Sequence, residues 1–355
     1  YEISTRDWSS DVCSSDLTGA TGLLGNNLVR LALEQGHRVV AIARSASTSP
    51  SLEGLDLQKI DMSLTDPNVV NRVEGPIDAI IHSAAHIHIG WSQRKDAIQT
   101  NKFGTTNAIL IAKKHKAKML HISTVNTLAI GSKDQIADEE TPGDGQLPCT
   151  YVTSKRLAEQ EVHQYIKAGG DASIVYPGFM LGPWDWKPSS GRMIVDLRKG
   201  APPLAPAGGC SICDPRDVAS AIFRAVEIAP SGSRYILAGE NWTYMQLWTE
   251  ITKQFGKRPP WTLLRAPGRF VAGSLGDLLG RITGKEPIIN SAAIGMSSQF
   301  HWYSSRRASE KLGYKTRPVS ESIADAIAWM HHHSDRKSTR LNSSHEWISR
   351  MPSSA

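Results

Sequence analysis

The sequence predicts an α/β protein with a Rossmann-type, doubly wound parallel sheet and a smaller, mostly helical C-terminal substrate domain. A glycine-rich turn at 17–25 leads from an aliphatic residue directly into an amphipathic helical stretch. From there to about residue 180, strand-like and helix-like segments alternate with short links. Strands that alternate with helices form parallel sheets covered on both faces. Beyond residue 180, Pro and Gly become frequent and helical patterns dominate.

The first half contains the elements of one domain. Leu24, Leu28, Leu31 and Ala32 have helical spacing, and Gly36 ends that helix. The nearly continuous apolar run at 37–43 is typical of a strand buried on both faces. Further strands are predicted at 55–62, 76–82, 118–123 and 172–176, and helices at 97–115 and 151–167. We therefore assign 17–180 to a cofactor-binding domain that also receives strands from beyond 180.

The second half, 181–334, is expected to form a substrate-binding domain over the C-terminal edge of the sheet. A single strand is predicted here, at 234–238. Helices are predicted at 216–229, 245–255, 271–283, 306–312 and 319–330.

The two ends differ from the rest of the chain. Residues 1–16 contain five Ser, residues 335–355 contain six, and neither stretch shows a helix or strand period. Both are expected to be non-native tails that resemble translated adapter read-through, with natural disordered tails as the alternative. In either case the first strand is predicted to be nearly absent, because Val12 and Leu17 are its only aliphatic residues and Asp16 lies beside them.

Composition excludes several classes of protein. Apolar residues make up 40% and charged residues 21% of the 355, which excludes a disordered chain. No apolar run approaches the ~18 residues of a membrane span, so we expect no membrane partner. The net charge of +6 comes from scattered basic residues without interleaved aromatic side chains, so we expect no nucleic-acid partner. Four cysteines exclude a disulfide-stapled scaffold and favour a reducing, cytoplasmic setting.

Gly19, Gly22 and Gly25 stand between a strand position and a helix start. A pyrophosphate can approach the backbone N–H groups of a helix N-terminus only where side chains leave room. The loop, including Thr21, Leu23 and Leu24, is therefore predicted to bind the phosphates of a dinucleotide, although a tight turn alone would also use such glycines.

The choice between the two nicotinamide nucleotides depends on the end of the second strand. An acidic residue there would hold the 2′-hydroxyl of NAD, but the sequence has Arg44, which suits the 2′-phosphate of NADP. NADP is therefore favoured, with NAD as the alternative. Asp61 and Met62 close the third strand, where the carboxylate either accepts a bond from the adenine amino group or only stabilises a turn.

Tyr151 and Lys155 lie one helical turn apart, a spacing that suits a phenol acting as acid or base beside an ammonium. The ammonium and a positively charged nicotinamide are expected to stabilise the phenolate of Tyr151, whose ordinary pKa is ~10. Thr124 ends a strand 27 residues before Tyr151, where its hydroxyl can orient a substrate oxygen.

The motifs T-G-A-T-G-L-L-G, D-M, H-S-A-A, N-K-F-G-T-T-N, I-S-T and Y-V-T-S-K occur in this order. The chain thereby resembles the extended short-chain dehydrogenases/reductases of the NAD-dependent epimerase/dehydratase superfamily, and most of all the dihydroflavonol 4-reductase-like branch. The resemblance covers about residues 17–331. It implies that Tyr151 is the acid/base, Lys155 its partner and Thr124 the substrate-orienting hydroxyl, with Ser123 as the adjacent alternative.

The same resemblance implies further cofactor contacts. The backbone of Ala84 and Ala85 would lie near the adenosine and ribose, and Asn101 would shape a strand–helix junction. The segment Tyr176, Pro177 and Gly178 would touch the nicotinamide carboxamide.

Candidate substrate residues lie in two loops. His86 follows the fourth strand, and Trp184, Asp185 and Lys187 follow the sixth. Solvent exposure of His86, and packing of the tryptophans at the domain junction, are the alternatives. The single C-x-x-C of Cys210 and Cys213 lacks further ligands, so no metal is expected.

The favoured function is an NADP-dependent reductase or dehydrogenase that acts on a small-molecule carbonyl or alcohol. The alternatives are a nucleotide-sugar 4-epimerase or dehydratase and a non-catalytic nucleotide sensor. Val125, Asn126 and Thr127 follow Thr124 where dehydratases of the superfamily typically carry acidic residues, and retention of Tyr151 and Lys155 argues against a sensor. The oligomeric state is left open, although relatives often pair as homodimers through the helices that correspond here to 97–115 and 151–167.

Overall fold

The computed structural model describes residues 14–132, 134–143 and 146–333, and it contains the predicted parallel sheet. Seven strands lie in the order β10-β6-β5-β4-β1-β2-β3, and every neighbouring pair is parallel. They are β1 (Ser14–Thr18), β2 (Arg38–Ala43), β3 (Gln58–Asp61), β4 (Ala79–His82), β5 (Lys118–Ile122), β6 (Ala172–Pro177) and β10 (Arg234–Leu237). The strand order reverses between β1 and β4, which confirms the doubly wound fold. In such sheets ligands bind beyond the carboxyl ends of the strands at this switch point.

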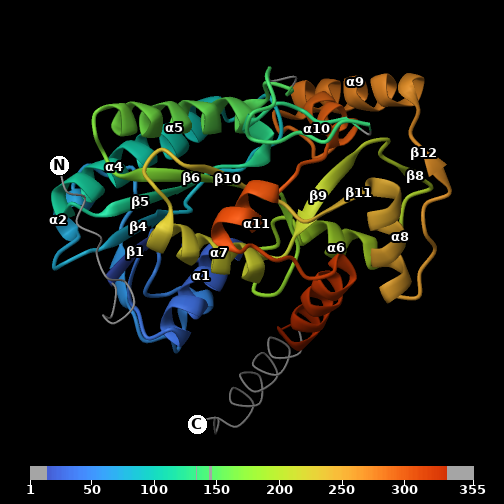
Figure 1. The fold of residues 1–355 in the computed structure, drawn as a ribbon. Helices are drawn as coiled ribbons and strands as arrows, with labels where there is room; N and C mark the ends of the chain where they lie inside the picture. Colours follow the sequence, from blue (N-terminus) through green and yellow to red (C-terminus); the bar gives the residue numbers. More distant parts are fainter. Residues whose placement is uncertain (1–13, 133, 144–145, 334–355) are drawn as a thin grey trace, which may run out of the picture.

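Helices cover both faces of the sheet (Figure 1). One face packs against α1 (Leu23–Glu34), α7 (Pro215–Ile228) and α11 (Arg306–Leu312), and the other against α2 (Val69–Arg72), α4 (Gly104–His115) and α5 (Thr150–Lys167). The two apolar cores are separated by the sheet. Strands such as β4, whose residues are all buried, explain the continuous apolar runs in the sequence.

Strand β1 corrects one prediction. The first strand was expected to be nearly absent, yet Ser14–Thr18 lies between β2 and β4 and pairs with both. Backbone hydrogen bonds to two neighbours do not depend on side chains, so a poor sequence still forms the central strand. Ser15 and Asp16 are buried there, and β1 therefore crosses the expected domain boundary at residue 17. Most of the expected tails, 1–13 and 335–355, lies outside the described residues.

The predicted helix at 97–115 is interrupted. It consists of α3 (Arg94–Ile98), a π-helical turn η2 (Gln99–Phe103) and α4. Such π turns often occur at functional sites, and this one contains Asn101.

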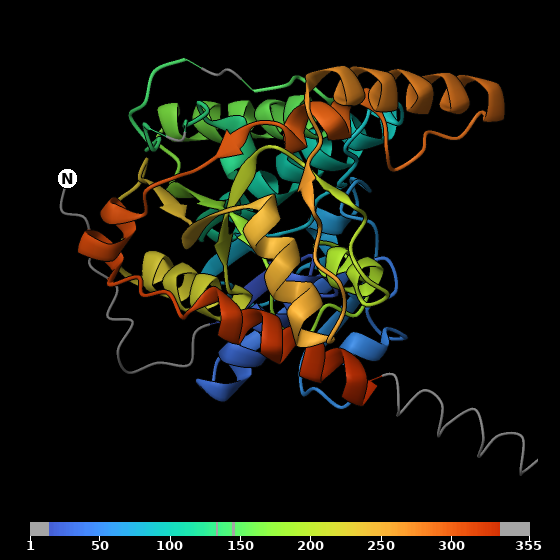
Figure 2. The same cartoon turned by 90° about the vertical axis from the view of Figure 1, so that its right-hand side faces the viewer.

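The C-terminal region is mostly helical, as predicted, but it also contains strands that the sequence did not reveal. Its helices are α6 (Arg192–Leu197), α8 (Tyr244–Gln254), α9 (Ala266–Thr283), α10 (Ser291–Ser297) and a helical segment at 319–333. Strand β9 (Gly209–Cys213) pairs with β7 (Phe179–Met180), β11 (Glu240–Thr243) and β13 (Phe300–His301), while β8 (Leu204–Ala205) pairs with β12 (Thr262–Leu263). The Gly and Ser content of β9 hides its strand character. Helix α8 and the segment 319–333 pack beside the sheet that contains β9 (Figure 2).

Candidate active site

The glycine loop joins β1 to α1 at the C-terminal edge of the sheet. Gly19 has a φ of +76°, and a Cβ added there would meet the backbone N of Ala84 at 2.6 Å. A Cβ at Gly25 would lie 2.1 Å from the carbonyl oxygen of Gly19. Both glycines are therefore needed for the chain to pack against itself, as the close strand–helix approach requires.

Gly22 is different. It caps α1 in an extended conformation, and the nearest atom to an added Cβ is the carbonyl oxygen of Gly19 at 3.4 Å. Internal packing therefore does not explain the glycine. No side chain caps α1, and its first turn has no acidic residue. Leu23 and Leu24 are buried. A ligand at this point would therefore contact backbone N–H groups at the positive end of the helix. Such an environment suits a negatively charged pyrophosphate.

The second strand leads into a loop held by Asp61. Arg44 follows β2 directly and is exposed, and Met62 donates from its backbone N to the carbonyl of Ala43 at 3.1 Å. The Asp61 carboxylate accepts from the backbone N of Ser47 at 2.9 Å. Hydrogen bonds with Ser47 lower the pKa of Asp61. Asp61 therefore fixes the loop that carries Arg44.

A buried polar chain runs behind the glycine loop from Thr18 to η2. The hydroxyl of Thr105 donates to the carbonyl of Asn101 at 2.7 Å, so it accepts from Nε2 of His82 at 2.9 Å. Nδ1 of His82 then accepts from the Thr18 hydroxyl at 2.8 Å, and that hydroxyl accepts from the backbone N of Ala84 at 3.2 Å. Burial and the charge of Lys155 lower the pKa of His82 to about 3, so the ring is neutral. Each N–H and O–H group of this chain then donates to one acceptor.

Asn101 links this chain to α5, the helix that carries Tyr151 and Lys155. Its amide donates to the Ser154 hydroxyl at 2.8 Å and to the carbonyl of His86 at 3.0 Å, and its oxygen accepts from the backbone N of His86 at 2.6 Å. Ser154 in turn donates to the carbonyl of Tyr151 at 2.9 Å. Asn101 therefore lies at a junction, and its hydrogen bonds hold α5 against η2.

Tyr151 and Lys155 lie on α5 opposite the end of β5. Burial raises the pKa of Tyr151 to about 12, against the opposing effect of a side-chain hydrogen bond with Thr124. Thr124 is buried and caps the 3₁₀ turn η3 (Val125–Thr127). The structure brings the three predicted catalytic residues together. Burial is the largest influence on the pKa of this phenol.

Lys155 is held by groups that the sequence did not reveal. Its ammonium donates to the carbonyl of Ile122 at 2.7 Å, and burial lowers its pKa to about 8 while Glu159 opposes that shift. Glu159 also accepts from Ser123 and, at 3.4 Å, from the Tyr176 hydroxyl. It follows Lys155 by one turn of α5, and that i, i+4 spacing is the signal that could have found it.

The remaining cofactor candidates are backbone positions at the end of β6. Gly178 donates from its backbone N to the carbonyl of Leu237 at 3.1 Å. A Cβ there would meet the carbonyl oxygen of Ser211 at 2.5 Å. Packing against β9 therefore explains the glycine, and Pro177 ends the strand beside it.

The loop after β4 is tied to the C-terminal region. His86 pairs with Gln93 at 3.0 Å, whereas His88 pairs with Glu286 at 2.9 Å. The Glu286 carboxylate also accepts from the backbone N of Trp91 and of Ser92. Burial opposes ionisation, but these hydrogen bonds outweigh it and lower the pKa of Glu286 to about 2. Glu286 was missed, because only the fold brings it to this loop.

The Trp184 loop packs against neighbouring structure. Trp184 has a φ of +73°, and the Arg30 guanidinium lies 3.3 Å from its ring centroid. The rings of Trp184 and Trp186 contact Trp329 of the segment 319–333. Asp185 is buried and accepts from the backbone N of Ser189 and of Gly191. Lys187 is exposed. These contacts favour the packing interpretation for the tryptophans and give Asp185 a turn-stabilising role.

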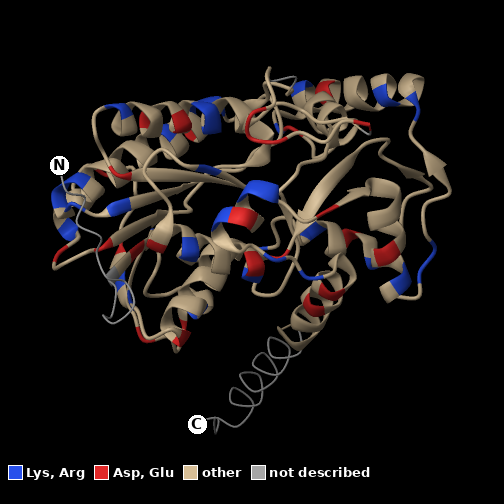
Figure 3. Ribbon diagram, in the orientation of Figure 1, with Lys and Arg blue, Asp and Glu red and all other residues tan. Residues whose placement is uncertain are grey.

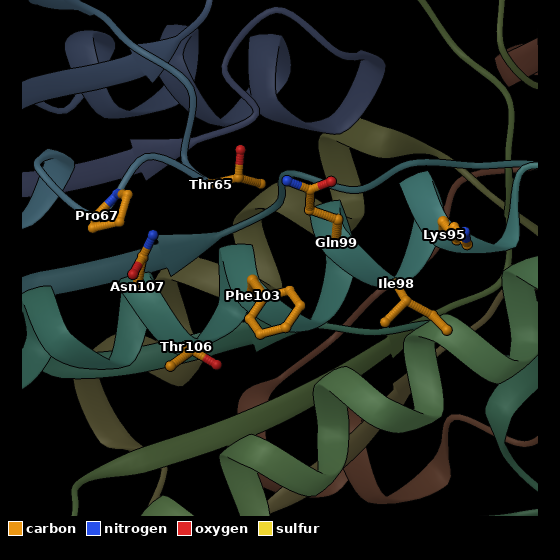
Figure 4. A pocket seen from close by; sticks show the side chains of 8 residues that line it. All are labelled: Thr65, Pro67, Lys95, Ile98, Gln99, Phe103, Thr106 and Asn107. Carbon is orange, nitrogen blue, oxygen red and sulfur yellow. The ribbon is translucent and has the colours of Figure 1, made fainter.

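A cavity of about 430 Å³ lies away from these groups. Figure 4 shows its lining on α3, η2, α4 and the loop after β3, with Phe103, Gln99 and Thr65 among the labelled side chains. None of its lining residues is a predicted site residue.

Two searches of the described residues concern other kinds of site. No group of three or more His, Cys, Asp or Glu side chains there is arranged to hold a metal ion. No helix in that part of the chain is long and apolar enough to cross a membrane. Cys210 and Cys213 are both buried, and burial raises the pKa of both thiols.

Known proteins are similar to this chain in sequence and in fold. The chain is 29% identical over 325 residues to a putative dihydroflavonol 4-reductase of Synechocystis sp., covering 89% of this chain and 94% of that one. It is 28% identical over 319 residues to sterol demethylase protein B of Methylococcus capsulatus, covering 88% and 97%. The crystal structure of gox2253 has a TM-score of 0.79 and 31% identity over 91% of this chain and 99% of that one.

The profile of the NAD dependent epimerase/dehydratase family matches residues 17–238, from the last part of β1 through β10. The matched span contains the glycine loop, the buried His82 chain and the Tyr151–Lys155 pair. The chain therefore belongs to the NAD dependent epimerase/dehydratase family.

Proposed function

We propose that the protein is an NADP-preferring reductase or dehydrogenase that transfers hydride between the nicotinamide and a carbonyl or carbinol carbon. The observation that supports it most is the convergence of Thr124, Tyr151 and Lys155 beyond the carboxyl end of β5, at the same edge of the sheet as the glycine loop. Two full-length relatives carry reductase names, the Synechocystis protein and a 2-alkyl-3-oxoalkanoate reductase of Stenotrophomonas maltophilia.

The side chains suit proton transfer to a substrate oxygen. With a pKa of about 12, the Tyr151 phenol is protonated at neutral pH and can donate its proton to a carbonyl oxygen. Thr124 hydrogen-bonds the phenol and can orient the same oxygen. Lys155, anchored on Ile122, is available to hold ribose hydroxyls. A bound nicotinamide nucleotide would supply or accept the hydride.

The phosphate-binding part is assigned to the loop of Gly19, Gly22 and Gly25. Arg44 is exposed beside it, on a loop that Asp61 fixes, and can pair with a 2′-phosphate. The position where an NAD-binding enzyme would carry an acidic residue has none, which supports NADP over NAD.

An epimerase or dehydratase remains the second candidate, because the family includes both activities by description. Against a dehydratase, η3 carries Val125, Asn126 and Thr127, so no carboxylate follows Thr124. Glu159, whose charge acts on Tyr151, is bonded to Ser123 and Tyr176 and is itself buried.

Measurement of cofactor consumption separates these candidates. The full chain would be incubated with NADPH or NADH and a panel of ketones, aldehydes and nucleotide sugars, while product and absorbance at the nicotinamide band are followed together. Loss of NADPH in a one-to-one ratio with product supports the reductase. Product formation without net loss of the nucleotide contradicts it and supports the epimerase.

The partner is a small molecule, and we also propose a homodimer through α4 and α5. Phe103 is 53% exposed and Leu110 43% exposed along η2 and α4, although both are large and apolar. The three described cysteines are free, which suits a cytoplasmic setting.

A further inference from the structure

Helix α9 faces the protein with its smallest residues. A Cβ at Gly276 would lie 1.9 Å from the carbonyl oxygen of Ile289, and one at Gly273 would lie 3.1 Å from Cα of Ser291. Gly280 similarly approaches Pro287. The helix therefore packs through glycines onto the segment that leads into α10.

The large apolar side chains of α9 point the other way. Phe270 is 77% exposed, Leu275 55% and Ile282 72%. They belong to a set that we call the α9 face: Phe270, Val271, Leu275, Leu278, Leu279 and Ile282 on the helix, with Ile288 and Ile289 after it. In ordinary surface helices the large apolar residues face the core. A cluster of exposed large apolar side chains is typical of an interaction site.

The apolar surface continues to the edge of the candidate active site. Ile87, Ile89 and Trp91 are 60%, 40% and 46% exposed on the loop after β4. The Trp91 indole donates to the Ser291 hydroxyl at 2.8 Å, so this loop adjoins the α9–α10 connection. Gly90 of the same loop accepts from the backbone N of Thr150, the first residue of α5.

Most of the charges beside the α9 face are basic. On α9 and next to its two ends the basic residues are Arg265, Arg269, Arg281 and Lys285, and the acidic ones are Asp277 and Glu286. The Glu286 carboxylate is held by His88 and by the backbone N of Trp91 and of Ser92. Asp277 is turned inward and accepts from the backbone N of Ser291 at 2.9 Å. Figures 1 and 3 show α9 along the outside of the molecule, with basic residues near both of its ends.

We propose that the α9 face docks onto an anionic lipid bilayer, with α9 lying in the plane of the surface. An exposed apolar helix face flanked by Lys and Arg is the pattern of helices that insert between headgroups and acyl chains. Anionic headgroups attract the flanking basic residues. Such a helix lies on the membrane and does not cross it, so the result agrees with the absence of a spanning helix among the described residues. It amends the expectation of no membrane partner.

A second copy of the chain fits this face less well. An isologous contact would bring Arg265, Arg269, Arg281 and Lys285 toward the same residues of the other copy, and like charges across an interface are unfavourable. No acidic side chain of α9 is free to compensate them, because Asp277 is bonded to Ser291.

Vesicle flotation of the full chain tests the proposal without reference to catalysis. Wild type is expected to float with vesicles of phosphatidylcholine and phosphatidylglycerol in equal parts, and to float far less with phosphatidylcholine alone. Leu275→Glu/Leu279→Glu is expected to abolish flotation. Arg281→Glu/Lys285→Glu is expected to weaken it at least about tenfold, since each basic residue near the surface contributes to the attraction.

The matched control is Ile136→Glu/Ile228→Glu, which introduces two carboxylates at exposed apolar positions outside the α9 face. It should float like wild type, and circular dichroism should give all variants the same melting temperature within a few degrees. Failure of wild type to float, or flotation unaffected by Leu275→Glu/Leu279→Glu, would overturn the proposal. Self-association of wild type that Leu275→Glu/Leu279→Glu removes, without vesicle binding, would assign the face to a second copy instead.

Discussion

Asp16 and Thr18 of β1 lie two positions apart and are both buried, but they differ in their hydrogen bonds and in their place along the strand. Thr18 is fully buried and shares its hydroxyl with His82 and the backbone of Ala84. Asp16 is fully buried, and neither of its carboxylate oxygens has a hydrogen-bond partner among the described residues. Thr18 lies at the carboxyl end of the strand, where the sheet meets the glycine loop, whereas Asp16 lies in the middle between β2 and β4.

Thr18 and Asp16 represent two kinds of buried polar side chain, one with hydrogen-bond partners and one without. At the C-terminal edge Thr18, His82 and Ser123 have hydrogen-bond partners. We propose that this edge serves a ligand or a reacting atom, so removal of its polar groups should alter chemistry or binding more than stability. In the interior of the sheet an unpaired carboxyl group only raises the free energy of the folded state. Variants of the two regions can break or sharpen this distinction.

The largest effect is expected at the edge, from Tyr151→Phe. Loss of the phenol proton should lower kcat by roughly 10²–10⁴-fold, the usual contribution of general acid–base catalysis. The dissociation constant for NADP(H) should change only a few-fold, because the pyrophosphate contacts lie on the glycine loop. Steady-state kinetics and titration of nucleotide fluorescence measure the two quantities. A variant that kept more than about a tenth of the wild-type rate would remove Tyr151 from the chemistry.

The interior is tested by Asp16→Val. Burial raises the pKa of Asp16 to about 8 from 3.8, so the folded protein retains a proton that the unfolded chain has lost between these pH values. Stability therefore falls as pH rises from about 4 to 8, and the variant removes that loss. We expect a gain that is roughly 2–4 kcal/mol larger at pH 7 than below pH 4, where only the cost of the unpaired neutral carboxyl group remains. Denaturant melts across this range measure it, with kcat unchanged. An equal gain at pH 4 and pH 8 would contradict an ionising Asp16.

The glycine loop contains both kinds of position within four residues. Gly25→Ala forces a Cβ onto the carbonyl of Gly19 and should lower the melting temperature clearly, by an overpacking cost of about 1–3 kcal/mol. In Gly22→Ala the Cβ makes only an ordinary contact, 3.4 Å from the carbonyl oxygen of Gly19, so the melting temperature should fall less than for Gly25→Ala while NADP(H) binding weakens. Thermal melts and nucleotide titrations of the pair decide the point. If Gly22→Ala bound the nucleotide like wild type, the loop would not hold a pyrophosphate.

The smallest expected effect concerns specificity. Arg44→Asp places a carboxylate at the end of β2, where it would repel a 2′-phosphate and accept from the 2′-hydroxyl of NAD. The ratio of kcat/KM for NADPH over NADH should fall by about tenfold or more, the equivalent of one lost charge-assisted hydrogen bond. Stability should not change, because Arg44 is exposed. Arg44→Gln serves as the control that removes charge without reversing it.

The prediction from sequence succeeded where a local pattern carries the physics. The spacing of Gly19, Gly22 and Gly25 predicts a turn at the start of a helix without any knowledge of the surrounding structure. Tyr151 and Lys155 share one face of a helix because they lie four residues apart. The apolar run of β2 likewise marks a doubly covered strand. Prediction failed for β1, because Ser14, Ser15 and Asp16 have no strand pattern and only pairing with β2 and β4 makes them one.

The sequence by itself determined the doubly wound fold, and it predicted a nucleotide-binding edge and the Tyr151–Lys155 pair, since these follow from periodicity and from residues within one turn of each other. Only the tertiary structure decided which polar groups have partners. Glu286 reaches His88 across 198 positions of the chain, and Thr18 reaches His82 across 64. It also turned the glycines of α9 inward and its leucines outward. An apolar helical stripe has the same appearance in a sequence whether the core or a bilayer covers it, because periodicity defines a face and not its neighbour.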